Sequence, residues 1–250
     1  MLSLLVATAL AQQPLTVPLG RAAVLAPQQA PTELTIDKPS VIDVQPVMPW
    51  LIVVGKSVGT TDLRMAHAEG TLTWAVTVSA DAPAPAGALL IDQPTRQVAV
   101  AVDDGWLLPW PDDGTALTVV KPDKVSAKPF GERWVWVQGE ASGVSDVIIE
   151  RGSEPPQITT VTVGRTGPAP EQAHPIGPPI QIPHGGTTLL DAPTRPEGWL
   201  VGRGARVAVE EAASPPGALR LRGTRAGSTW MVTSYADGHV EVRQIVVSEP

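Results

Sequence analysis

A pair of glycines four residues apart occurs three times in this chain at constant spacing, and this repeat limits the possible folds more than any other feature. The pairs are Gly55 and Gly59, Gly139 and Gly143, and Gly223 and Gly227, each 84 residues after the one before. Leu51–Val54, Trp134–Val137 and Leu219–Arg222 precede the three pairs, and two further strand-like segments follow each of them. Self-similarity at a fixed period is typical of tandem modules, so the sequence predicts three copies of one unit.

The periodic segments of the three copies alternate apolar and polar residues with a period of two. The closing segments are Trp74–Val78, Thr160–Val163 and Val242–Val247. Such alternation, bounded by Gly, Pro or Asp, indicates half-buried strands. The chain also holds 27 Pro and 23 Gly, both of which destabilise helix interiors. We expect an all-β protein of three small β-sandwich-like modules, each with about six strands.

Module boundaries follow from Pro-rich stretches that are typical of extended spacers. We expect modules over residues 12–80, 88–164 and 180–250, joined by linkers at 81–87 and 165–179. Each copy is expected to open with a strand that stops at Gly20, Gly105 or Gly185. In the earlier part of the copies, Val41 aligns with Val125 at the same offset of 84 residues.

Residues 1–11 form an apolar run that ends in Ala9-Leu10-Ala11, which is typical of a signal peptide cleaved after Ala11. The run lacks a preceding Lys or Arg, so a first buried strand or a misplaced start remains an alternative. No other stretch approaches the roughly 18 apolar residues of a membrane span. We expect an exported protein, periplasmic or outer-membrane-associated. The net charge of −7 argues against nucleic acid as a partner, and the lack of Cys excludes disulfides.

The segment from Gly55 to Gly59 also fits two catalytic motifs by letters alone. A phosphate loop needs Gly five residues before Gly55, where Trp50 stands, and a nucleophile elbow needs a following helix. Ser57 becomes Ala141 and Arg225 in the other copies, whereas both glycines are kept. We therefore interpret the six glycines as structural hairpin residues and expect neither an enzyme nor a cofactor site.

Two other groups of residues are candidates for partner contact. Asp103–Gly114 holds four aspartates around Trp106 and Trp110, which suits calcium ligation, stacking on a sugar or peptide, or two Asp-Gly turns with Trp packed beneath. Arg220, Arg222 and Arg225 form a basic stripe, either a solvated face or a salt-sensitive contact with an acidic partner. The four histidines are never three to five residues apart, so no local metal pair is expected.

The first copy resembles the N-terminal domain of the secretins of Tad/Flp-type pilus assembly, the pilus formation protein N-terminal region. The resemblance covers residues 15–79 and is carried by Leu15–Gly20, Asp37–Val44, Val53–Leu63 and Trp74–Val78. The copy is more distantly similar to bacterial immunoglobulin-like domains. Nothing in the chain resembles the pore-forming domain of a secretin.

The first resemblance implies a non-enzymatic assembly or docking component of an envelope pilus or secretion complex, with protein partners. The second implies a surface or adhesion protein built of immunoglobulin-like modules. In the first case, the first module is expected to dock.

Overall fold

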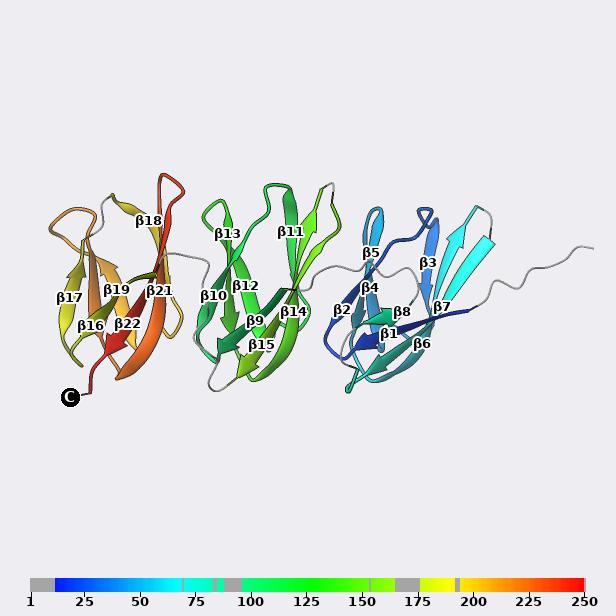
Figure 1. Cartoon of the computed structure of the whole chain (residues 1–250), viewed down its shortest axis with the longest axis horizontal. Coiled ribbons are helices and arrows are strands. Elements are labelled where there is room, and N and C mark those ends of the chain that lie inside the picture. The colour runs from blue at the N-terminus through cyan, green and yellow to red at the C-terminus, as the bar shows by residue number, and fades with distance from the viewer. Residues whose placement is uncertain are drawn as a thin grey trace, which may run out of the picture.

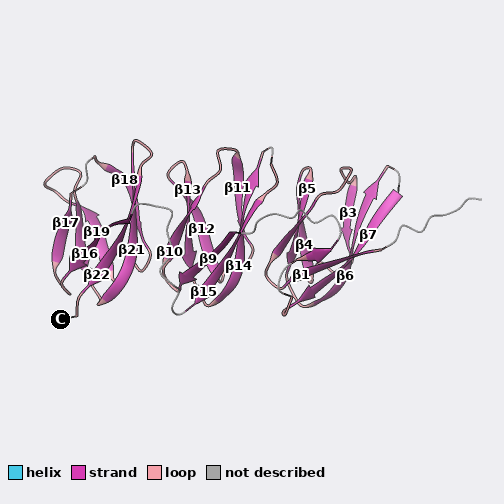
Figure 2. Ribbon diagram, in the orientation of Figure 1, coloured by secondary structure: helices cyan, strands magenta, loops and turns pink. Residues whose placement is uncertain are grey.

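The computed structural model describes residues 12–68, 70–82, 85–87, 96–152, 154–164, 176–191 and 194–249. All regular elements in these ranges are strands (Figure 2). They form three β-sandwiches that follow one another along the long axis of the molecule (Figure 1). The predicted all-β fold of three tandem modules is therefore confirmed. The expected signal peptide and most of the second linker lie outside the described residues.

Module 1 packs a five-stranded sheet, sheet A, against a three-stranded sheet, sheet B. Sheet A has the order β3-β6-β7-β1-β8 and sheet B the order β2-β5-β4. The strands are β1 (Gln13–Pro18), β2 (Ala22–Leu25), β3 (Glu33–Ile36), β4 (Ile42–Val47), β5 (Trp50–Gly55), β6 (Gly59–His67), β7 (Gly70–Ser79) and β8 (Ala86–Gly87).

Module 2 repeats this plan with a four-stranded sheet C, order β11-β14-β15-β9, and a three-stranded sheet D, order β10-β13-β12. The strands are β9 (Arg96–Ala101), β10 (Gly105–Pro109), β11 (Gly114–Val119), β12 (Val125–Phe130), β13 (Trp134–Gly139), β14 (Gly143–Arg151) and β15 (Gln157–Gly164).

Module 3 has a four-stranded sheet E, order β16-β22-β21-β18, and a three-stranded sheet F, order β17-β20-β19. The strands are β16 (Ile176–Ile182), β17 (Thr187–Leu190), β18 (Pro196–Val201), β19 (Val207–Glu211), β20 (Leu219–Gly223), β21 (Gly227–Tyr235) and β22 (Val240–Val247).

The first strand of each module lies parallel to its last long strand, in the pairs β1·β7, β9·β15 and β16·β22. The chain then crosses to the smaller sheet through a residue of positive φ: Gly20 (73°), Asp103 (60°) or Gly185 (75°). The expectation that Gly105 ends the second opening strand is therefore wrong. Asp103 takes that place, because Asp tolerates the left-handed region better than most residues, and Gly105 begins β10.

Two module boundaries also differ from the expected ones. Ala86 and Gly87, expected in the first linker, pair with Thr16 and Leu15 at the edge of sheet A. In module 3, pairing with β22 begins at Ile176, within the expected second linker. Pro-rich sequence is compatible with an edge strand, where fewer backbone N–H groups must be paired.

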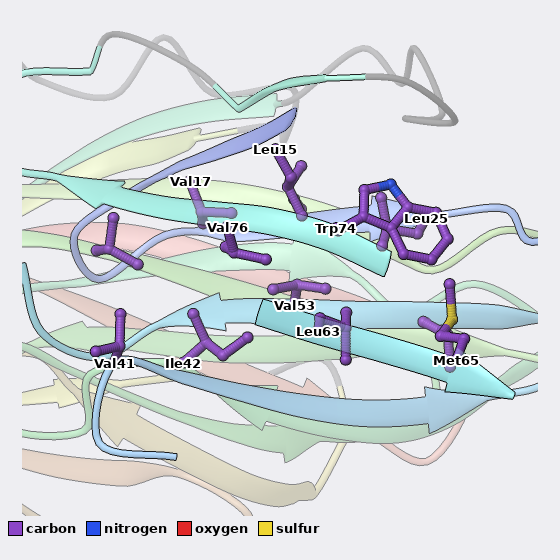
Figure 3. Packing of buried hydrophobic residues seen from close by; sticks show 13 residues of the cluster. Leu15, Val17, Leu25, Val41, Ile42, Val53, Leu63, Met65, Trp74 and Val76 are labelled. Carbon is purple, nitrogen blue, oxygen red and sulfur yellow. The ribbon is translucent and has the colours of Figure 1, made fainter. Parts of the chain in front are cut away.

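The core of each module lies between its two sheets. In module 1 it gathers inward-facing residues of both sheets around Trp74, which is fully buried with Leu15, Leu63 and Met65 (Figure 3). A single Trp covers a large apolar area, which suits a module of this small size.

A buried hydroxyl forms the same hydrogen bond in all three modules. Thr61, Ser145 and Thr229 accept the backbone N–H of Lys38, Lys121 and Arg203 at 2.9, 2.9 and 2.7 Å. The neighbouring carbonyls of Val41, Lys124 and Arg206 accept equivalent backbone N–H groups. Val41 thus corresponds to Lys124 rather than Val125, and the predicted alignment is wrong by one residue there. The offset changes after this point, because the loop between Phe130 and Trp134 in module 2 is one residue longer than the loop between Val47 and Trp50 in module 1.

The six repeated glycines occupy two kinds of position. A Cβ on Gly55 would lie 2.8 Å from the carbonyl oxygen of Pro18, and Gly139 and Gly223 meet Ala101 and Pro183 in the same way. The second member of each pair has positive φ: 154° at Gly59, 149° at Gly143 and 121° at Gly227. The first glycine permits the close approach of the crossing chain, and the second permits the turn.

We expect Gly55→Val and Gly59→Val each to lower the free energy of unfolding of module 1 by about 1–3 kcal/mol. Ser57→Ala is the matched control, because its exposed hydroxyl only donates to the Ser40 carbonyl; its effect should stay below about 1 kcal/mol. Urea unfolding followed by Trp fluorescence measures all three. Equal stability of the glycine variants and wild type would contradict this account.

Candidate functional site

The two tryptophans considered for partner contact point into module 2. Trp106 is 7% exposed and belongs to the core with Leu108 and Val135, and Trp110 packs against the same cluster. Neither ring is presented as a free stacking platform. Both Trp side chains therefore lie as in the alternative with two Asp-Gly turns and Trp packed beneath them.

The aspartates of the same segment point to different partners. Asp113 forms an ion pair with Arg151 at 2.7 Å, whereas Asp104 lies at the contact with module 3. Within the described ranges, no three His, Asp or Glu side chains are placed to hold a metal ion. His174 lies outside the described residues.

The three arginines of the basic stripe separate into two places. Arg220 and Arg222 lie on the exposed outer face of β20 in sheet F, where Arg220 pairs with Glu210 at 3.3 Å. Arg225 instead lines a cleft at the contact between modules 2 and 3, together with Arg203 and Arg206. The sequence did not single out Arg203 or Arg206 as candidates for partner contact.

The modules are packed against one another through apolar faces. At the first junction, sheet B of module 1 presents Ala22, Val24, Ile52 and Val54 to Ile148 and Ile158 of sheet C. At the second junction, sheet D presents Leu107, Phe130 and Trp136 to Val232, Val240 and Val242 of sheet E. In both cases the smaller sheet of one module covers the outer face of the larger sheet of the next.

A buried ion pair accompanies the first apolar contact. Arg21 Nε donates to Asp146 Oδ1 at 2.7 Å, and Asp146 is fully buried while Arg21 is 16% exposed. The backbone N–H of Ala22 donates to the other carboxylate oxygen at 2.8 Å. Thr160 Oγ1 donates to Oδ1 and accepts from Arg21. These bonds give the carboxylate a partner on each side of the junction.

Burial raises the pKa of Asp146 above its ordinary value, although the positive charge of Arg21 and the hydrogen bonds from Ala22, Thr160 and Arg21 lower it. Removing a charged pair from water costs free energy that offsets much of the attraction between the two charges. The ion pair specifies how the modules meet rather than adding much net stability.

The second junction places its acid, the half-buried Asp104, on the opposite module. Asp104 occupies the position of Arg21, since the carbonyls of Arg21 and Asp104 accept the N–H of Gly55 and Gly139 respectively. Trp230 occupies the position of Asp146, three residues after the second glycine of its pair. Burial raises the pKa of Asp104, opposed by N–H groups of Gly105 and Trp230 and by the charges of Arg203 and Arg206.

Close packing accompanies this contact. A Cβ on Gly202 would lie 2.5 Å from Asp104 Oδ1, and Arg203 Nε donates to the Val102 carbonyl at 3.1 Å. Gln138 Nε2 reaches the Gly202 carbonyl at 3.4 Å.

Sequence reasoning missed both junctions, although a signal was present. Leu51–Val54 and Val147–Ile149 are continuous apolar runs, and all of these residues are buried. Uninterrupted apolar strands indicate that both faces of a sheet are buried. A single sandwich buries only the inner face of each of its two sheets, so the outer faces must be covered by something else.

The fold and these contacts define a stack of three β-sandwiches, in which module 1 is the first. Residues 11–79 match the family model of the pilus formation protein N terminal region, which confirms the resemblance of the first module to that family. No curated protein matches the chain. Within the described residues, no helix has the length and apolar character that crossing a membrane requires.

Similarity to solved structures is low. Domains 4–9 of the surface layer protein SbsC are 14% identical, with 90% of this chain and 40% of that chain covered and a TM-score of 0.27. The I9–I11 tandem from titin is 9% identical, with 96% and 98% covered and a TM-score of 0.20. The endo-fucoidan hydrolase MfFcnA4 is 13% identical, with 95% and 44% covered and a TM-score of 0.23. The present chain spans less than half of the SbsC and hydrolase chains.

We expect Arg21→Ala to destabilise the first junction by about 3–5 kcal/mol, because it leaves the Asp146 carboxylate buried without a counter-charge. The double variant Arg21→Met/Asp146→Leu should recover most of that loss. Arg64→Ala is the control: its pair with Asp37, also 2.7 Å long, is exposed and should contribute at most about 1 kcal/mol. Urea unfolding monitored by Trp fluorescence compares them. A double variant as unstable as Arg21→Ala would contradict the prediction.

The raised pKa of Asp104 predicts a specific pH dependence. A carboxyl whose pKa is higher in the folded state stabilises the fold most when protonated, and this contribution is lost as pH rises through the folded pKa. The test compares the free energy of unfolding of wild type with that of Asp104→Asn. The wild-type value minus the variant value should decrease between about pH 4 and the raised pKa of Asp104 in the folded protein. Urea unfolding at several pH values measures this difference, and an increase with pH would refute it.

Proposed function

We propose that this protein is a non-enzymatic, exported envelope component of a pilus or secretion complex, in which the first module docks onto a protein partner. The observation that carries the proposal is the family match over residues 11–79. It covers the module at one end of the stack, and modules 2 and 3 extend from it in a packed row (Figure 1). Periplasmic or outer-membrane-associated placement is part of the proposal.

The arrangement of module 1 supports a docking role for the sheet that module 2 does not cover. Sheet B is engaged by module 2 through the first junction, so the outer face of sheet A points away from the rest of the stack. This face includes Asp62 and Arg64, and β3 forms one edge of the sheet. An unpaired edge strand can accept a strand from a partner. The opposite edge is covered by β8.

The β4 edge of sheet B is less suited to strand addition. β4 at the edge of sheet B contains Pro46, which lacks a backbone N–H and disfavours pairing with a further strand. Docking is therefore proposed at the β3 side of sheet A.

A second function, as a surface or adhesion protein of immunoglobulin-like modules, is favoured by the packed row of three sandwiches. In that function the stack acts as a spacer, and module 1 needs no partner in an envelope assembly.

Affinity purification of the full chain from envelope fractions distinguishes these functions. Asp62→Arg on the outer face of sheet A is compared with Glu210→Arg, a matched charge reversal on the outer face of sheet F at the other end. We expect Asp62→Arg to reduce recovery of pilus or secretion components at least about tenfold, a loss of about 1.4 kcal/mol, and Glu210→Arg to leave it unchanged.

Both variants should keep a melting temperature close to that of wild type, because the interactions that they break, Asp62 with Gln12 and Glu210 with Arg220, are exposed. Loss of partners only with Glu210→Arg would place docking in the third module. Recovery of no envelope component by the wild-type chain would favour the spacer function.

A further inference from the structure

Two turns of module 3 bring three arginines to one cleft beside module 2. The cleft has a volume of about 450 Å³ and is lined by Arg203, Arg206 and Arg225, with Asp103 and Gln138 contributed by module 2. Backbone N–H groups of Thr224 and Arg225 donate to the Arg206 carbonyl at 2.8 and 3.3 Å. These bonds hold the two turns side by side, so the arginines are gathered by the fold itself.

Most of the hydrogen-bond donors in this cleft are unused. Arg203 donates through Nε to the Val102 carbonyl at 3.1 Å, and Arg206 donates through Nη1 to the Ser228 carbonyl at 2.8 Å. The guanidinium of Arg225 makes no hydrogen bond or ion pair with any residue that the structure describes. Each guanidinium carries five N–H donors, so the cleft offers an excess of charged donors with too few acceptors.

The positive charges also repel one another. The pKa of Arg206 is lowered by burial and by the charges of Arg203 and Arg225, against the attraction of Asp104 and Asp103. Asp104 already accepts the N–H groups of Gly105 and Trp230, which leaves Asp103 as the exposed carboxylate of the cleft. Three cations facing two carboxylates favour a further anion from outside the chain.

We propose that this cleft binds an acidic peptide segment of a partner protein through carboxylates held by Arg203, Arg206 and Arg225. Arginine matches the two oxygens of a carboxylate with paired N–H donors. The volume lies within the roughly 300–1,000 Å³ of ligand sites and exceeds the space of a single inorganic anion. The site lies on modules 2 and 3, so it stands whether or not module 1 docks.

Titration calorimetry with the full chain and an acetylated hexaglutamate peptide, at about 50 mM salt to limit screening, tests the proposal. We expect saturable binding at one site, and none of a hexaglutamine peptide. Arg225→Gln should weaken binding about tenfold at an unchanged melting temperature. Arg222→Gln is the matched control, an exposed arginine on sheet F outside the cleft, and should bind as wild type does. Asp103→Asn should bind more tightly, because it removes the competing carboxylate.

The proposal is overturned if hexaglutamate shows no saturable binding, or if Arg222→Gln loses as much affinity as Arg225→Gln. Inorganic phosphate is the third ligand in the experiment. It fills only part of the cleft and should bind more weakly than the peptide; equal affinity would refute the assignment to a peptide.

Discussion

Apolar residues on both faces of a sheet are the constraint on which this architecture depends. In module 1 the core between the sheets uses one face of β5, and Ile52 and Val54 on its other face must also leave water. The next module supplies that cover with Ile148 and Ile158. At about 25 cal/mol per Å² of buried apolar surface, such contacts are the main attraction between modules. Small sandwiches that would be marginal alone thereby support one another.

The charged residues at the two junctions specify the order of the modules. The first junction places its cation, Arg21, on the preceding module and its acid, Asp146, on the following one. The second reverses this, with Asp104 preceding and Arg203 and Arg206 following. If module 1 packed on module 3, Arg21 would face Trp230 and further arginines, an unfavourable arrangement of like charges. Related modules with similar apolar faces are thus kept from pairing in the wrong sequence.

Much of the fold could be predicted from the sequence because it is local. Strand alternation and the glycine pairs depend on near neighbours, and repetition made them visible three times. The errors occurred where copies differ in length or residue type: Asp103 replaces a glycine at a positive φ, and Lys124 rather than Val125 corresponds to Val41. The arginine cleft was missed because Arg203 and Arg225 are far apart in the sequence and come close only where two turns pair. A linear stripe of charges gives no indication of such a contact.

The parallel pairing of the first and last long strands in each sandwich determines how the molecule responds to mechanical force. Because β1 and β7 are hydrogen-bonded neighbours running the same way, tension along the chain pulls them in opposite directions along their length. The hydrogen bonds between them are then loaded together in shear, instead of being opened one after another. The same holds for β9 with β15 and β16 with β22. Each sandwich therefore resists extension by a force that acts along its first and last long strands.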